Sequence, residues 1–271
     1  MFNDCHIHTG NALDSKDAFI KQLDEAGVSR AILFSYHPNS FTMFGLDRPN
    51  DRLAMVMDWA SCNPDRIVPF YWIDPLDEDA AEQVDRAVEA NIRGFKVICN
   101  RYYPGDDKPM KIWERIAKAN KPMLFHSGIL YANGPSSMYN RPAFFEYLVD
   151  IPNLKFALAH VSWPWCDENL AVYGKWQSAK RNNLTTAEMF IDTTPGTPGI
   201  YRAEVLTKIY RIGYDIENNV MFGTDCLSEY SVSYANGIYE MDSKILDDLA
   251  VSEQHRHNYF CNNFLRFIGE A

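Results

Sequence analysis

Two histidines separated by a single residue stand within the first ten positions of the chain. His6 and His8 belong to the run Asp4-Cys-His6-Ile-His8, in which polar and apolar residues alternate. On a β-strand this alternation places the three polar side chains on one face. Both imidazoles could then reach one cation just beyond the strand's end, and neutral imidazole suits zinc and related divalent metals. His-x-His is a short pattern, so the rest of the chain must support this interpretation.

Short β-like runs alternate with amphipathic helical patterns along the whole chain. Strands are predicted in the first ten residues and at 30–36, 67–73, 94–98, 122–126, 155–161, 189–193 and 220–224. Between them lie helical patterns such as 15–26, where Phe19, Leu23 and Ala26 share one face. Eight strands, each followed by a helix or by room for one, predict an α/β fold, the (β/α)8 TIM barrel. No Gly/Pro/Ser-rich linker divides the 271 residues, so one domain spanning 1–271 is expected.

In such a barrel the active site lies at the C-terminal ends of the strands. The polar residues predicted there are His6, His8, Lys96, His126, His160 and Asp225. Five of these six are of metal-ligand type, and they include four of the chain's seven histidines. Scattered histidines would rarely fall at strand ends in this way, so the pattern indicates a metal-dependent active site.

These residues lie in motifs that resemble the amidohydrolase superfamily, and most of all its amidohydrolase-related branch of hydrolases and decarboxylases. The matching motifs are Asp4-Cys-His6-Ile-His8-Thr-Gly10, Phe125-His126-Ser-Gly128, Ala159-His160-Val161 and Phe222-Gly-Thr-Asp225. They run from the first predicted strand to the eighth, so the resemblance covers essentially the whole barrel. Together the motifs are specific, although each one alone is not.

The resemblance implies one divalent metal ion, with zinc as the expected metal, and a role for each matching residue. The metal ligands would be His6, His8, His126 and Asp225. Asp225 would also accept a proton from the water that the metal activates, and His160 would serve as an acid, a base or an electrostatic group beside the metal. General chemistry agrees, because a divalent metal lowers the pKa of its water and imidazole titrates near neutrality.

Two further residues are predicted to contact substrate. Lys96 follows the Gly-Phe context of the fourth strand, and Trp163 lies just after His160. Relatives with two metals carry a carboxylated lysine at the end of strand four, so a bridging Lys96 stays an alternative, as does a lysine paired with an internal carboxylate. Other loop candidates for substrate contact are His37 and three arginines that could hold a carboxylate: Arg48, Arg101 and Arg141.

The expected function is hydrolysis of a small lactone, amide or ester by metal-activated water. Non-oxidative decarboxylation of an aromatic or muconate-like acid is the alternative within the same family. Metal-dependent phosphoesterases and TatD-like nucleases also open with His-x-His, but the nucleases are expected to carry glutamate where this chain has Lys96. A barrel that binds a ligand without catalysis is the alternative of a different class. Loss of an expected metal ligand would mark it, and none is missing.

Charge and composition limit the classes of partner that we expect the protein to bind. The formal charge of −10, without a basic run, argues against nucleic acid and leaves a small molecule as the expected partner. No apolar run approaches about 18 residues, so no membrane span is expected. Six scattered cysteines without Cys-x-x-Cys, and a strand that begins almost at residue 1, favour a reduced, cytoplasmic protein without a leader. A homo-oligomer is left open.

Overall fold

The computed structural model describes residues 1–10, 15–41, 51–132 and 135–270. Its strands are β1 Phe2–His8, β2 Val28–Phe34, β3 Ile67–Trp72, β4 Gly94–Val97, β5 Met123–Phe125, β6 Lys155–Leu158, β7 Glu188–Asp192, β8 Val220–Met221 and β9 Cys226–Leu227. Its α-helices are α1 Lys16–Ala26, α2 Arg52–Ser61, α3 Ala80–Glu89, α4 Asp107–Lys118, α5 Cys166–Arg181, α6 Gly199–Arg211, α7 Val232–Asp248, α8 Glu253–His257 and α9 Asn263–Ile268. Shorter 3₁₀ or π segments are η1 Ser136–Tyr139, η2 Pro142–Asp150, η3 Ala159–Ser162 and η4 Asn258–Asn262.

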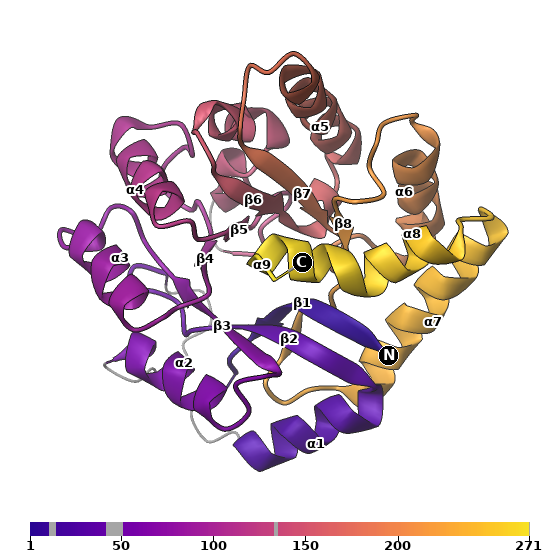
Figure 1. Ribbon diagram of the computed structural model, residues 1–271, viewed down its shortest axis with the longest axis horizontal. Helices are drawn as coiled ribbons and strands as arrows, with labels where there is room; N and C mark the ends of the chain where they lie inside the picture. The colour runs from indigo at the N-terminus through magenta and orange to yellow at the C-terminus, as the bar shows by residue number, and fades with distance from the viewer. Residues whose placement is uncertain (11–14, 42–50, 133–134, 271) are drawn as a thin grey trace.

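The strands form one parallel sheet in the order β8-β7-β6-β5-β4-β3-β2-β1-β9. β8 and β9 are two short parts of the predicted eighth strand, and they pair with β7 and β1 respectively. Between them, the backbone N–H of Cys5 donates to Phe222 O at 3.1 Å, and that of Asp225 donates to His6 O at 3.0 Å. These bonds close the ring, and helices surround it (Figure 1). The single-domain TIM barrel is therefore confirmed.

The helices lie where the amphipathic patterns predict them. α1 begins after Ser15, whose side-chain oxygen accepts a hydrogen bond from the N–H of Ala18, and buries Phe19 and Leu23. It ends at Gly27, whose φ of 73° is easily adopted only by glycine. Among the described residues, none of the helices combines the length and the apolar character that crossing a membrane requires.

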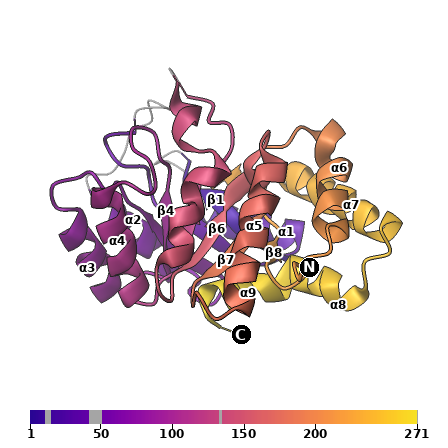
Figure 2. The same ribbon diagram turned by 90° about the horizontal axis from the view of Figure 1, so that it is seen from above.

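Helix α9 lies across the end of the barrel at which the strands begin (Figures 1 and 2). Its residues Phe264, Phe267 and Ile268 join the inward-facing side chains of the strands in one apolar cluster. The ring of Phe267 lies 6.1 Å from that of Phe70 and 5.3 Å from that of Phe190, between centroids. The N-terminal end of the barrel is thus filled, which leaves the opposite end for a site.

Two predicted strands, 155–161 and 220–224, end three residues early in the structure, and both differences concern site residues. β6 ends at Leu158 rather than at residue 161, because His160, Val161 and Ser162 have positive φ angles of 60°, 45° and 56°. The eighth strand breaks after Met221, and Asp225 also has a positive φ, of 60°. In addition, the short helix predicted around 144–149 is the 3₁₀ segment η2. The two expected catalytic residues therefore lie on tight turns beyond the strands.

Candidate active site

Three side chains predicted to bind a metal meet at the C-terminal end of the barrel. His6 Nε2 lies 3.2 Å from His8 Nε2, and Asp225 Oδ1 lies 3.3 Å from the first and 3.5 Å from the second. They are the one group of three or more possible ligands found among the described residues. A tetrahedral ion with bonds of about 2.0–2.1 Å separates its ligand atoms by about 3.3–3.4 Å. The three residues therefore fit a single divalent cation.

Asp4 shares the strand face of the two histidines but plays a different part. Its buried carboxylate accepts hydrogen bonds from the backbone N–H of Thr224 at 3.0 Å, the Thr224 hydroxyl at 2.6 Å and the Tyr230 hydroxyl at 2.9 Å. It also accepts from the N–H of His6 at 3.1 Å. Burial raises the pKa of Asp4 to about 6, against the opposing effect of these bonds. Asp4 thus ties β1 to the turn that carries Asp225.

A residue that the sequence analysis missed orients His6. Asp192, the last residue of β7, is buried, and its Oδ2 lies 2.6 Å from His6 Nδ1. Its other oxygen accepts the backbone N–H of Thr194 at 2.7 Å. A carboxylate at Nδ1 holds the proton there and directs the lone pair of Nε2 to a metal. The rule that picked out the other strand ends would also have found Asp192, because the seventh strand was predicted.

His160 stands beside the three ligands on its own turn. Its Nδ1 lies 3.0 Å from the hydroxyl of Thr194, and its ring centroid lies 5.1 Å from that of His6. A side chain at Gly196 would bring a Cβ within 2.8 Å of the Cβ of His160, so this approach requires glycine. The placement agrees with a group near the metal, and its acid-base role stays a prediction.

His126 lies next to His160, with 4.9 Å between the ring centroids, but outside the close group of three. Its Nε2 is 3.1 Å from the carbonyl of Ile129, which assigns the proton to Nε2 and leaves the lone pair on Nδ1. Gly128, two residues on, has φ +94°, and a Cβ there would meet Trp163 O at 2.4 Å. The fourth-ligand role of His126 stays a prediction.

Lys96 is fully buried at the end of β4, with its Nζ 3.2 Å from His6 Nε2 and 4.9 Å from the centre of the Phe34 ring. Burial lowers its pKa to about 8, although Asp225 and Asp192 act in the opposite direction. Lys96 does not line the cavity described below. Its position beside a metal ligand is compatible with a supporting role or with a carboxylated bridge, and direct substrate contact stays untested.

The electrostatics of the histidines suit metal binding. Burial is the largest cause that holds the pKa of His6 and of His126 well below the ordinary value, and it lowers those of His8 and His160 as well. Burial also raises the pKa of Asp225, but the hydrogen bond with His8 and the nearby His160 and Lys96 outweigh it and lower that pKa. Neutral imidazoles and an ionised carboxylate are the forms that bind a metal.

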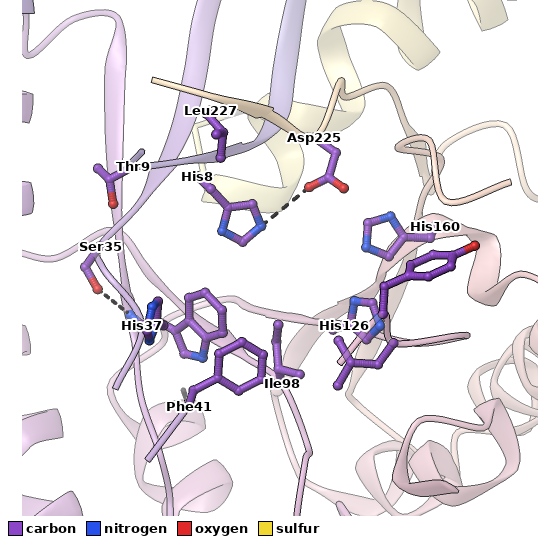
Figure 3. Close-up of a pocket in the computed structure, with 13 residues that line it drawn as sticks. His8, Thr9, Ser35, His37, Phe41, Ile98, His126, His160, Asp225 and Leu227 are labelled. Atoms are coloured by element: carbon purple, nitrogen blue, oxygen red, sulfur yellow. Dashed lines mark hydrogen bonds and ion pairs between the residues drawn. The ribbon is translucent and has the colours of Figure 1, made fainter. Parts of the chain in front are cut away.

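A cavity of about 250 Å³ opens onto this site (Figure 3). His8, His126, His160 and Asp225 line one part of it. Across the open space, Figure 3 shows His37, Phe41 and Ile98, and Trp72 and Leu130 complete this mainly apolar side. His37, a candidate for substrate contact, thus lines the cavity, and its contact with a substrate stays a prediction.

Three other predicted substrate contacts are not among the described residues that line the cavity: Trp163, Arg101 and Arg141. The ring of Trp163 stacks on that of Tyr201 with 6.4 Å between centroids. Arg101 and Arg141 form ion pairs with Asp74 and Glu168 respectively. Arg48 lies outside the described residues.

The chain matches the amidohydrolase family over residues 4–269, and it belongs to this family. This agrees with the resemblance seen in the motifs and with an active site at the C-terminal end of a barrel. Members of this family generally bind a divalent metal, and the group of His6, His8 and Asp225 offers a site for one. No curated protein matches the chain by sequence.

Solved structures share the fold at low identity. A probable 2-pyrone-4,6-dicarboxylic acid hydrolase from Acinetobacter baumannii, with citric acid bound, has a TM-score of 0.64 and 13% identity over 99% of both chains. A 2,6-dihydroxybenzoate decarboxylase from Rhizobium has a TM-score of 0.64 and 18% identity over 99% of both chains. A 5-carboxyvanillate decarboxylase from Novosphingobium aromaticivorans, with bound manganese, has a TM-score of 0.61 and 14% identity over 92% of this chain and 80% of that one. These similarities support the barrel and do not choose between the two reactions.

Proposed function

We propose that the protein is a metal-dependent hydrolase of a small lactone, amide or ester. The observation that carries the proposal is the meeting of His6, His8 and Asp225 at ligand spacing beside His160, at the wall of a cavity. The expected ion is one zinc, because two imidazoles and a carboxylate suit zinc, and manganese is the competing metal. The charge of −10 favours a small substrate over a polyanion.

The chain's own residues divide the proton transfers between them. When bound, the ion polarises a substrate oxygen and lowers the pKa of water. Asp225 is ionised and lies beside His6 and His8, and it accepts the proton that the attacking water loses. His160 faces the cavity and passes this proton on from Asp225 to the departing oxygen or nitrogen. Water thus adds to the carbonyl carbon, and the bond to the leaving group breaks.

Non-oxidative decarboxylation is a second candidate, favoured by the aromatic and aliphatic side of the cavity. Phe41, Trp72, Ile98 and Leu130 form one apolar cluster there. An apolar wall suits an aromatic acid. In this reaction the bond between the ring carbon and the carboxylate breaks and carbon dioxide leaves. A proton taken up from solvent through His160 replaces the carboxylate on the carbon.

Elemental analysis and a substrate panel test the proposal. We expect about one equivalent of a divalent metal per chain, most of it lost in His8→Ala and retained in the control His257→Ala, which changes a histidine of α8 remote from the cavity. Small lactones, amides, esters and aromatic acids are then supplied to the metal-loaded protein. Release of an acid from a neutral substrate supports hydrolysis, whereas carbon dioxide supports decarboxylation. A metal-free protein with undiminished turnover would contradict both.

A further inference from the structure

Trp72 ends β3 and stands at the boundary between the metal-ligand side and the apolar side of the cavity. Its ring centroid lies 5.5 Å from that of His8 and 5.1 Å from that of Phe41. The side chain is 3% exposed, and what remains exposed faces the cavity that it lines. Trp72 therefore lies beside the place where a bound molecule would meet the metal ligands.

The backbone holds the indole in a fixed position. The N–H of Trp72 donates to the hydroxyl of Ser35 at 2.9 Å, and its carbonyl accepts a hydrogen bond from the Arg52 guanidinium. The ring packs in the small cluster of Phe41, Ile98 and Leu130, which is separate from the two clusters of the barrel. Because the backbone of Trp72 is hydrogen-bonded and its ring is packed, the indole edge has a fixed orientation.

The indole N–H of Trp72 is the feature that this packing leaves unused. It donates no hydrogen bond to any residue that the structure describes, and it is not among the polar atoms sealed from solvent without a partner. Two other buried tryptophans differ, because Trp113 donates to Pro104 O at 3.0 Å and Trp176 donates to Ala187 O at 2.8 Å. A nearly buried donor open to a cavity is completed by whatever the cavity binds.

The size of the cavity limits the ligand. An apolar cavity of ~150 Å³ is enough for benzene. The volume of about 250 Å³ therefore admits one ring with a few substituents. His8, His160 and Asp225 line one part of this space, and Phe41 and Ile98 lie across it.

We infer that Trp72 is a specificity-determining residue, which donates its indole N–H to an acceptor oxygen on the ring of a small planar acid or cyclic carbonyl compound. The inference rests on the proposed function only in that the reacting carboxyl or carbonyl group lies at the metal ligands. The acceptor is a hydroxyl, ether or carbonyl oxygen away from the reacting group. A ring of equal size without this oxygen leaves the indole donor unpaired and binds more weakly.

Binding of matched benzoates to the metal-loaded protein tests this assignment without requiring turnover. The probes are benzoate, its three methoxy isomers and the three ethyl isomers of nearly equal size. At one ring position or more, we expect methoxy to bind about 3- to 10-fold more tightly than ethyl. In Trp72→Phe this ratio of methoxy to ethyl affinity should fall to about one, whatever the change in the affinity for benzoate itself. The control Trp163→Phe, at a residue that is not among those lining the cavity, should keep the preference.

Indole resonances of the wild-type protein give a second readout that needs no variant to fold. Of the six tryptophan N–H signals, one should move further with the preferred methoxy isomer than with its ethyl counterpart. The inference is overturned if wild type shows no preference, if Trp72→Phe retains it, if no indole signal distinguishes the pair, or if no benzoate binds. Loss of the preference in Trp72→Phe by a protein that turns over neither class of substrate would uphold the binding role and refute the proposed reaction.

Discussion

The two ends of the barrel use their side chains in opposite ways. At the N-terminal end, α9 inserts Phe264 and Phe267 into the apolar interior, and the neighbouring Glu270 is held by two arginines. At the C-terminal end, histidines and carboxylates are buried around a cavity, and an indole donor remains unused. The N-terminal end is filled by packed side chains, whereas the C-terminal end has polar side chains that line a cavity and can bind a ligand. Stability and chemistry are thus placed at different ends, as is general in TIM barrels.

The two ends also differ in which residues adopt positive φ angles. Beyond the strands these include His160, Val161, Ser162 and Asp225, whereas in the turns ahead of β4, β5, β6 and β7 they are asparagines, which tolerate this conformation better. Val161 is β-branched, for which this conformation is particularly unfavourable. Strained residues of this kind cost about 1–3 kcal/mol each and persist because the surroundings over-determine them. The filled N-terminal end supplies packing that helps to offset this strain.

Removing the acid-base groups at the C-terminal end should give the largest effect. Asparagine at 160 or 225 keeps the left-handed backbone, which asparagine tolerates better than most residues. We expect His160→Asn and Asp225→Asn each to lower kcat by a factor of about 10²–10⁴, because proton transfer by a positioned side chain typically raises the rate by this factor. The free energy of unfolding should change by less than about 1 kcal/mol. Steady-state kinetics and urea unfolding of the metal-loaded variants measure both quantities.

Metal content separates the two roles within that prediction. His160→Asn should keep its ion, because we place His160 beside the metal ligands, while Asp225→Asn should bind the ion more weakly. Loss of the metal in His160→Asn, or full activity in Asp225→Asn, would contradict the assignment. Either result would leave the comparison of the two ends intact, unless the variants also unfold.

A truncation at the opposite end should do the reverse. Phe267→Ala removes a fully buried ring from between Phe70 and Phe190. Changes of this kind lower the free energy of unfolding by about 3–5 kcal/mol. Activity per folded molecule should stay near that of wild type, because the cavity lies at the other end. Urea unfolding and activity corrected for the folded fraction test this, and a stable but inactive variant would show that the two ends are coupled.

Sequence reasoning found the regular parts of both ends because they follow periodic patterns. The strand starts and the buried face of α1 agree with the structure to within about two residues, because apolar periodicity depends on burial that the barrel supplies. The histidines were located by the rule that barrel strands end at the active site. Asp192 was missed only because that rule was not applied to the seventh strand.

Other features could not be read from the chain. The run Ala159-His-Val-Ser162 contains no glycine, so nothing local signals its left-handed turn. The close approach of Gly196 to His160 joins segments that are distant in sequence, so it could not be read from the chain either. Likewise, the exclusion of Trp163 from the cavity depends on tertiary packing that no spacing encodes. The role of Trp72 shows the same limit, because an indole that ends a predicted strand looks like any core residue until its unused N–H is seen.

The ion pairs of Glu270 should give the smallest effect and show how little surface charge adds to the closed end. Arg30 and Arg93 both contact this carboxylate, and the hydrogen bond from Arg30 is the largest cause that lowers its pKa below the ordinary 4.5. A lowered pKa means that the native state favours the ionised form. The stabilisation is therefore present above pH 4.5 and is lost as the pH falls through the lower, native value.

Because the group is partly exposed, Glu270→Gln should cost no more than about 1 kcal/mol at pH 7 and low salt. Urea unfolding of wild type and variant should converge in acid and in high salt, where the pairs are neutralised or screened. A difference that persists in acid would mean that shape at this position, rather than charge, holds α9 against the barrel.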